Sequence, residues 1–240
     1  MRTNLQYVLK DPNQKLILVT SAISGEGKTF CSVNLAAVMA ISNKKTLIVG
    51  LDLRRPKVHK TFDLENEKGI STYLIGKHAI DEIIYPSKVP NLDVAVSGPV
   101  PPNPAELIET KRMHDFFRIA RERYDYIVVD SPPLAIVSDG LYATQFADAN
   151  LFVLRQRYSQ KDEIKLINEI DEKGKMKNMN LIINDIEKPR GYAYGYSYRY
   201  GYSYGYNYGY GYGYGYYEED RAKSPLALKF ARWWHQLKKA

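Results

Sequence analysis

The stretch Leu16–Phe30 reads LILVTSAISGEGKTF, and it decides the fold. It begins with an apolar run typical of a buried strand and ends where a segment with helical spacing begins. Between these, Ala22 to Thr29 fits the phosphate-binding pattern GxxxxGK[ST], except that Ala22 replaces the first glycine. The strand, glycine-bearing loop and helix start predict a phosphate site, although an ordinary strand-to-helix turn with a chance Gly-Lys-Thr would look similar.

The residues of this loop have distinct expected roles. Gly25 and Gly27 permit close approach, so that backbone N–H groups can converge on a β-phosphate at the helix N-terminus. Lys28 would reach the β- and γ-oxygens, and the Thr29 hydroxyl would bind Mg²⁺. The residues we expect to contact the nucleotide are Ser24, Gly25, Glu26, Gly27, Lys28, Thr29 and Phe30.

Two further apolar strands are followed by an aspartate. Asp52 follows the run Leu47 to Val49, and Asp130 follows Tyr126 to Val129. A lone aspartate here would be read as a helix cap or a turn residue. Together with the phosphate loop, the two carboxylates predict a Mg-nucleotide site, because an anchored strand can present a carboxylate to the metal directly or through water. We therefore expect Thr29, Asp52 and Asp130 at the metal.

Strand-like and helix-like segments alternate along most of the chain. The apolar runs span residues 15–20, 46–49, 92–96, 126–129, 150–154 and 180–183, and the segments with helical spacing span 29–41, 104–123, 138–146 and 161–173. Alternation predicts an α/β domain over residues 1–188, a doubly wound and mostly parallel sheet with helices on both faces. Residues 59–90 are less periodic and predict short helices and loops at one edge.

The sequence changes character at Pro189. Residues 189–220 are predicted to be a disordered tyrosine-rich tail, because no apolar segment remains to cover a strand there. The same composition would suit an adhesive tract that self-associates by stacking. Residues 221–240 predict a short basic amphipathic segment, docking on a partner or a membrane surface or packing back on the domain. The candidate phosphate acceptors are Tyr192, Tyr194, Tyr196, Tyr198, Tyr200, Tyr202, Tyr204, Tyr206, Tyr208, Tyr210, Tyr212, Tyr214, Tyr216 and Tyr217.

Composition sets outer limits on function. A single cysteine, Cys31, in 240 residues argues against a disulfide-stapled secreted protein and favours the cytoplasm. No apolar run reaches the roughly 18 to 20 residues that span a bilayer, and the N-terminus lacks a signal-peptide layout. The net charge of +7 is the sole feature that points to nucleic acid, which we do not expect as a partner.

With these motifs in place, the chain resembles the bacterial tyrosine kinases of polysaccharide polymerisation and export. The resemblance runs from Arg2 to about Ile186. It rests on the phosphate loop, DLRRP at residues 52–56, GPVPPNPAELI at 98–108, VDSPP at 129–133 and the tyrosine cluster, which occur in the family's order. It implies a fold related to the MinD and ParA ATPases, and a protein-tyrosine kinase that uses Mg²⁺ and ATP to autophosphorylate its own tail.

The resemblance also implies partners. Subunits would form ring-like homo-oligomers in which one subunit's tail enters its neighbour's active site. A membrane-embedded activator, fused or separate, would hold the kinase at the inner face of the cell membrane. A dedicated phosphatase would reverse the reaction, and polysaccharide-synthesis enzymes are further candidate substrates. Asn184 resembles the family's adenine-contacting position.

Two departures from the family pattern bear on catalysis and assembly. Family members commonly carry Asp-x-Asp in the second motif, whereas Gly50 stands at the first of these positions. Asp52 alone would then help the metal and accept the tyrosine proton, with Arg54 either stabilising the transferred charge or pairing at the surface. The family also has a Glu-x-x-Arg-x-x-Arg oligomerisation helix, of which Arg2 alone matches the final arginine. We interpret this as a fragment or a shortened start, which a transmembrane module would precede.

Two other functions stay open at this point. One is an oligomeric ATP-dependent scaffold, in which Gly50 has removed the chemistry and the tail recruits partners. The other is a MinD- or ParA-like ATPase, which would have no use for 14 closely spaced tyrosines. A eukaryotic-type kinase is excluded, because the chain has no HRD or DFG motif.

Overall fold

The computed structural model describes residues 2–11, 13–134 and 139–187. The chain divides into two units, Met1–Pro189 and Arg190–Ala240. The tyrosine-rich tail predicted at 189–220 and the amphipathic segment predicted at 221–240 lie outside the described residues.

Within the described residues, seven strands form one sheet in the order β3-β4-β2-β5-β1-β6-β7. Neighbouring strands are parallel except for β3 and β4, which pair antiparallel at one edge. The strands are β1 Leu16–Ser21, β2 Thr46–Gly50, β3 Ile84–Pro86, β4 Leu92–Ala95, β5 Tyr126–Asp130, β6 Ala149–Arg155 and β7 Met179–Asn184.

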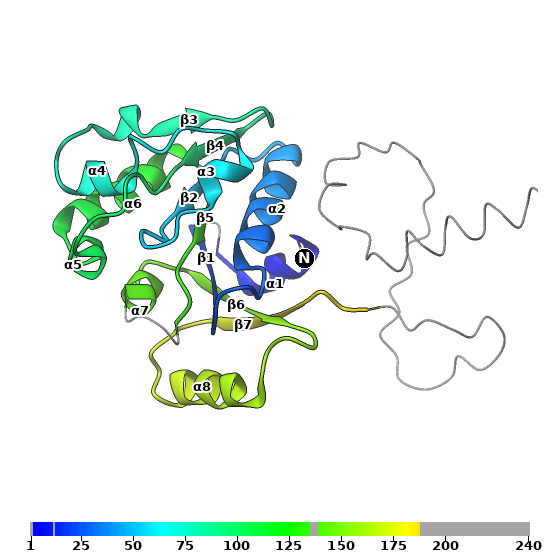
Figure 1. Ribbon diagram of the computed structural model, residues 1–240. Helices are drawn as coiled ribbons and strands as arrows, with labels where there is room; N and C mark the ends of the chain where they lie inside the picture. Colours follow the sequence, from blue (N-terminus) through cyan, green and yellow to red (C-terminus); the bar gives the residue numbers. More distant parts are fainter. Residues whose placement is uncertain (1, 12, 135–138, 188–240) are drawn as a thin grey trace, which may run out of the picture. The chain divides into compact units, whose positions relative to one another are not determined.

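The helices lie on both sides of this sheet (Figure 1). Their bounds are α1 Arg2–Val8, α2 Lys28–Ile41, α3 Val58–Thr61, α4 Ile70–Leu74, η1 Ile80–Glu82, α5 Pro104–Ile108, α6 Lys111–Arg123, α7 Asp139–Thr144 and α8 Lys161–Glu172. Side chains of the central strands alternate between two buried clusters: Leu16 and Leu18 pack with α4, α5 and α6, while Ile17 and Val19 pack with α1 and α2. The near-continuous apolar runs follow from burial on both faces.

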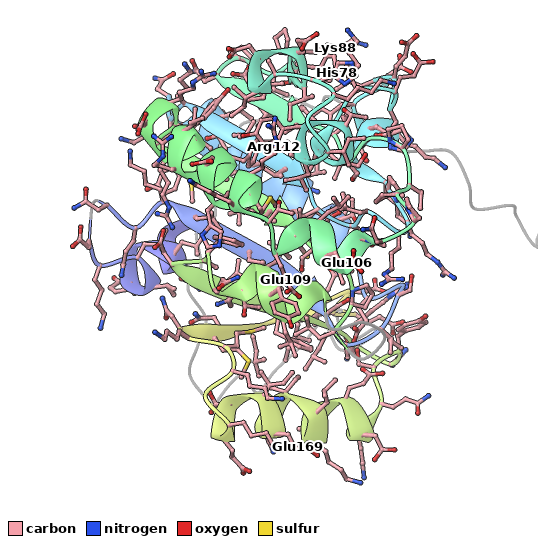
Figure 2. All side chains as sticks on the ribbon, turned by 90° about the vertical axis from the view of Figure 1, so that its left-hand side faces the viewer. His78, Lys88, Glu106, Glu109, Arg112 and Glu169 are labelled. Carbon is pink, nitrogen blue, oxygen red and sulfur yellow. The ribbon has the colours of Figure 1, made fainter. Side chains whose placement is uncertain are left out.

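Side-chain contacts join two of the covering helices and lie along the outer face of a third. Arg112, labelled on α6 in Figure 2, donates through Nε to the carbonyl of Tyr73 in α4 at 2.9 Å, and its guanidinium lies over the Tyr73 ring. Glu169 lies on the outer side of α8, where it pairs with Lys173. Among the described residues, no helix combines the length and the apolar character needed to cross a membrane.

The doubly wound, mostly parallel α/β fold predicted from the sequence is confirmed, with every predicted strand present. The edge strand β3 was not predicted, because three residues are too few to show a period. The helix predicted over 104–123 is interrupted. Thr110 takes an extended backbone, its hydroxyl donates to the carbonyl of Leu107 at 2.8 Å, and α6 starts afresh after it. Side-chain spacing continues across such a break, so periodicity alone cannot reveal it.

The order of the strands positions the site. Strand β1 lies between β5 and β6. The connection that leaves β1 leads to β2 on one side, and the connection that leaves β5 leads to β6 on the other side. Ligands of doubly wound proteins bind at the carboxyl ends of the strands where this reversal occurs. Here the carboxyl ends of β1, β2 and β5 meet, since Val19 and Gly50 are both in register with Asp130.

Candidate active site

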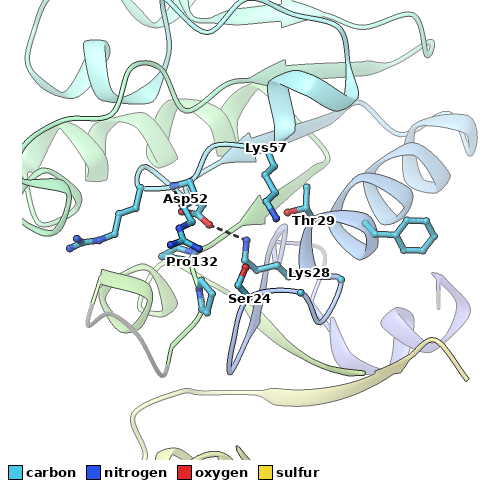
Figure 3. Close-up of a pocket in the computed structure, with 12 residues that line it drawn as sticks. Ser24, Lys28, Thr29, Asp52, Lys57 and Pro132 are labelled. Atoms are coloured by element: carbon cyan, nitrogen blue, oxygen red, sulfur yellow. Dashed lines mark hydrogen bonds and ion pairs between the residues drawn. The ribbon is translucent and has the colours of Figure 1, made fainter. Parts of the chain in front are cut away.

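A pocket of about 560 Å³ opens at this edge of the sheet (Figure 3). Its size lies within the range of nucleotide and small-ligand sites. One wall is the loop after β1 with the start of α2, and the opposite wall is the segment after β2. The lining residues are Ser24, Gly25, Gly27, Lys28, Thr29, Phe30, Asp52, Arg54, Arg55, Lys57, Pro132 and Pro133.

The loop after β1 has a backbone that requires glycine at two positions. Gly25 and Gly27 have φ angles of 97° and 94°, in the left-handed region. A Cβ on Gly27 would lie 2.1 Å from Nδ2 of Asn184, and one on Gly25 would lie 2.6 Å from the Tyr158 hydroxyl. Gly27 is also the N-cap residue of α2, and it has no side chain that could cap the first N–H groups of the helix. The first N–H groups of the 14-residue α2 are thus available to an anion.

Lys28 and Asp52 form an ion pair at the pocket floor. Nζ of Lys28 lies 3.1 Å from Oδ2 of Asp52 and 3.9 Å from Oδ1 of Asp130. The other oxygen of Asp52 accepts a hydrogen bond from the backbone N–H of Arg55 at 2.9 Å. Figure 3 shows Lys28 reaching from the loop toward Asp52 across the pocket, with Lys57 directed toward Thr29 from the wall after β2.

Asp130 is fully buried behind this pair. The Thr29 hydroxyl donates to its Oδ2 at 2.7 Å, and the Ser32 hydroxyl donates to its Oδ1 at 3.2 Å. Burial raises the pKa of Asp130, and the charge of Lys28 opposes that rise. A cation placed beside Thr29 would add to the effect of Lys28 and favour the ionised carboxylate.

The oxygen atoms of Thr29, Asp52 and Asp130 fit the chemistry of Mg²⁺. This ion prefers oxygen ligands, uses one or two carboxylates, and completes its shell with water and substrate phosphates. Among the described residues, no three His, Cys, Asp or Glu side chains gather as a self-sufficient metal site. The arrangement therefore fits a metal ion that arrives with a phosphate ligand.

The remaining predicted residues fall into two groups. Phe30 and Arg54 line the pocket with exposed side chains. The Glu26 side chain lies behind the loop, where its carboxylate accepts hydrogen bonds from the backbone of Ile23 and the hydroxyl of Ser159. Asn184 also reaches the loop from behind, since its Nδ2 donates to the carbonyl of Glu26 at 3.0 Å.

Several pocket and loop residues were missed by the sequence reasoning. Arg55, Lys57, Pro132 and Pro133 follow directly on the two aspartate motifs, so their proximity to Asp52 and Asp130 was an available signal. The contacts of Tyr158 behind the loop had no such signal, because they join residues 134 positions apart.

Comparison with known proteins identifies the family. Residues 14–183 match the sequence model of a family described as an AAA domain. Tyrosine-protein kinase YwqD of Bacillus subtilis is 35% identical over 196 residues, which cover 81% of this chain and 83% of YwqD. The chain belongs to the bacterial tyrosine kinase family.

Solved structures agree with this bacterial tyrosine kinase assignment. The kinase domain of Escherichia coli tyrosine kinase Etk superposes with a TM-score of 0.75 at 35% identity, covering 83% of this chain and 78% of that domain. The chain matches 27% of full-length Etk from strain K12, so it corresponds to part of that protein. MinD of Pyrococcus horikoshii, at 18% identity and a TM-score of 0.60, shares the fold. The predicted family and its relation to MinD-type P-loop proteins are confirmed.

Proposed function

We propose that this kinase binds MgATP and transfers the γ-phosphoryl group to tyrosines at 192–217 of another copy of the chain. The observation that carries the proposal is the Lys28–Asp52 ion pair, which lies beside the glycine-bearing loop and the Thr29–Asp130 contact. A phosphate-binding cation, a proton acceptor and metal-binding oxygens thereby share one pocket. The tail supplies 14 acceptors.

The chain's own residues have separate tasks in this transfer. The loop amides and Lys28 would hold the phosphates, and Thr29 and Asp130 would hold Mg²⁺, with Asp52 beside them. When bound, the ion would neutralise phosphate charge. Phosphoryl transfer has a loose transition state, so positioning and charge neutralisation supply most of the rate enhancement. One carboxylate at Asp52 is then sufficient, without a second at position 50.

In the transfer step, the phenol oxygen of the acceptor tyrosine forms a bond to the γ-phosphorus. The bond from that phosphorus to the oxygen bridging to the β-phosphate breaks, and ADP leaves with the electron pair. The phenol proton passes to Asp52, whose carboxylate gains this capacity when phosphates draw Lys28 away. Tyrosine has a pKa near 10, so proton removal need not run far ahead of transfer. Arg54, on the pocket wall, stabilises charge on the moving group.

Asn184 is assigned to the adenine, as the family resemblance implies. The biological role proposed for the reaction is control of polysaccharide polymerisation or export, through modification of the tail and of polysaccharide-synthesis enzymes. A membrane-embedded activator would bring the kinase to the inner face of the cell membrane, and a phosphatase would remove the phosphates from the tail tyrosines.

The test is incubation of purified protein with MgATP, alone and with membranes from the source organism, followed by mass spectrometry of the tail. Lys28→Met and Asp52→Asn are the active-site variants. Phosphotyrosine within 192–217 that disappears in both variants supports the proposal. Bound ATP without any tyrosine phosphate, even when membranes are present, contradicts it.

A scaffold is the second candidate, and Gly50 is the observation that favours it. A built Cβ at Gly50 would lie 2.8 Å from Oγ of Ser97 and 3.3 Å from Cβ of Val58, so neighbouring side chains occupy the space of a second carboxylate. An ATP-bound oligomer without phosphotyrosine would support this scaffold. ATP hydrolysis without phosphotyrosine would instead support a MinD- or ParA-like ATPase.

A further inference from the structure

The back of the phosphate loop is held by side chains that lie at least 130 positions further along the chain. The Tyr158 hydroxyl donates to the carbonyl of Ser24 at 2.9 Å, and Nη1 of Arg155 donates to the carbonyl of Gly25 at 3.1 Å. Asn184 donates to the next carbonyl, that of Glu26. Three successive carbonyls of the loop therefore each accept one hydrogen bond from β6, from the loop after it, or from β7.

These contacts determine where the loop amides point. A trans peptide is planar, so its C=O and its N–H point in opposite directions. Holding the carbonyls of Ser24, Gly25 and Glu26 at the back of the loop therefore turns the N–H groups of Gly25, Glu26 and Gly27 the other way. In the proposed function, these N–H groups belong to the nest that would receive a phosphate.

The donors are themselves held in place. The guanidinium of Arg155 lies 5.3 Å from the Tyr158 ring centroid, and its Nε donates to Oδ2 of Asp185 at 3.0 Å. The backbone N–H of Arg155 donates to the Ser159 hydroxyl at 2.9 Å, and that hydroxyl donates to the Glu26 carboxylate. The Tyr158 hydroxyl also fits against Gly25, where a Cβ would collide with it.

We propose that Arg155 and Tyr158 are positioning residues, which set the phosphate loop in its nucleotide-binding conformation from behind. The two side chains act on ATP affinity through the loop backbone and touch no phosphate themselves. This inference rests on the nucleotide-binding part of the proposed function. It adds Arg155 and Tyr158 as two side chains that control ATP affinity from behind the loop.

The variants are Tyr158→Phe, which removes one hydroxyl and keeps the ring, and Arg155→Met, which removes the guanidinium. The matched controls are Tyr142→Phe, on the exposed side of α7, and Arg157→Met, whose side chain pairs with Glu187. Both controls remove the same chemical groups outside the phosphate loop. Melting temperatures of all four variants identify any loss of folding.

The first measurement is amide hydrogen exchange of residues 23–31 in the full chain without added nucleotide. The Ile23 and Cys31 amides at the two ends of the loop donate to the Glu26 carboxylate and to the carbonyl of Gly27. We expect their exchange to rise about 2- to 10-fold in Tyr158→Phe, the range of one hydrogen bond's net contribution. Exchange in the central strand β5 should stay unchanged. Rates equal to those of the two controls would overturn the proposal.

The second measurement is calorimetric titration with MgADP, followed by kinetics with ATP. The expected result is a Kd raised about 2- to 10-fold by Tyr158→Phe, with a higher KM for ATP and an unchanged kcat at saturation. A lower kcat at unchanged KM, or a melting temperature that falls in step with the affinity, would overturn it. Absence of MgADP binding by the unaltered protein would contradict the proposed function, and hydrogen exchange would still decide the positioning role.

Discussion

Nζ of Lys28 and Oδ2 of Asp52 lie 3.1 Å apart, and both side chains are less than one-tenth exposed. The lysine that we assign to the phosphates and the carboxylate that we assign to the tyrosine proton therefore satisfy each other. In the proposed reaction, phosphates that bind Lys28 replace Asp52 as its partner. The same exchange releases the Asp52 carboxylate for proton transfer.

This exchange predicts opposite effects of Asp52→Asn on binding and on chemistry. ADP without Mg²⁺ should bind at least as tightly as to the unaltered protein, because Lys28 no longer has a competing carboxylate. Tail phosphotyrosine should fall by about 100-fold or more, the usual contribution of a general base. Calorimetry and mass spectrometry on the same preparations measure the two effects. Asp162→Asn, on the exposed side of α8, is the control, and full phosphotyrosine in Asp52→Asn would refute the assignment.

Restoring a carboxylate at position 50 should cost stability. Gly50→Asp must displace the Ser97 hydroxyl, which donates to the carbonyl of Gly50 at 2.8 Å, and must crowd Val58. We expect a loss of about 1 to 3 kcal/mol in the free energy of unfolding, as for other overpacked sites. Urea denaturation measures it. The double variant Gly50→Asp/Ser97→Gly should recover part of the loss, and a Gly50→Asp protein as stable as the unaltered one would contradict the packing argument.

The carboxyl behind the phosphate loop predicts a pH dependence. Burial raises the pKa of Glu26, and the charge of Glu163 raises it further. The hydrogen bonds from Ser159 and Ile23 lower this pKa but do not cancel the rise. The folded protein therefore holds this proton at a pH where the unfolded chain has released it. The stability contributed by the group is present below the unfolded pKa of about 4.5 and is lost as pH rises through the folded pKa.

Glu26→Gln removes this titration. The free energy of unfolding of Glu26→Gln should increase relative to that of the unaltered protein as the pH is raised from 5 to 8. Urea denaturation at each pH measures this difference. Glu169→Gln, on the outer side of α8, is the exposed control. A difference between Glu26→Gln and the unaltered protein that shrinks toward pH 8 would reverse the sign and refute the prediction.

Phosphorylation of the tail should disperse oligomers that the tail helps to hold. Each phosphate adds about −1.5 to −2 charges, so several in a closely spaced tract repel one another and reverse the basic balance of the chain. Light scattering before and after incubation with MgATP should show a lower mass, and Lys28→Met should show no change. An adhesive tail that needs no ATP would give the same mass in both samples.

The phosphate loop, the two aspartate motifs and the parallel strands could be read directly from the sequence. Each is a local pattern: a run of apolar residues, a glycine spacing, or a carboxylate just after a strand. A local pattern was also the source of the error at Thr110, because helical side-chain spacing continued across the break between α5 and α6.

Tertiary structure alone decided which of these residues meet. The Thr29–Asp130 contact joins positions 101 apart, and the Tyr158–Ser24 contact joins positions 134 apart. Such contacts depend on the order of strands in the sheet, which places β5 and β6 on either side of β1. The sequence by itself determined the fold class and the phosphate loop, because local spacing encodes local conformation. The pairing of Lys28 with Asp52 and the support behind the loop came from packing between distant segments.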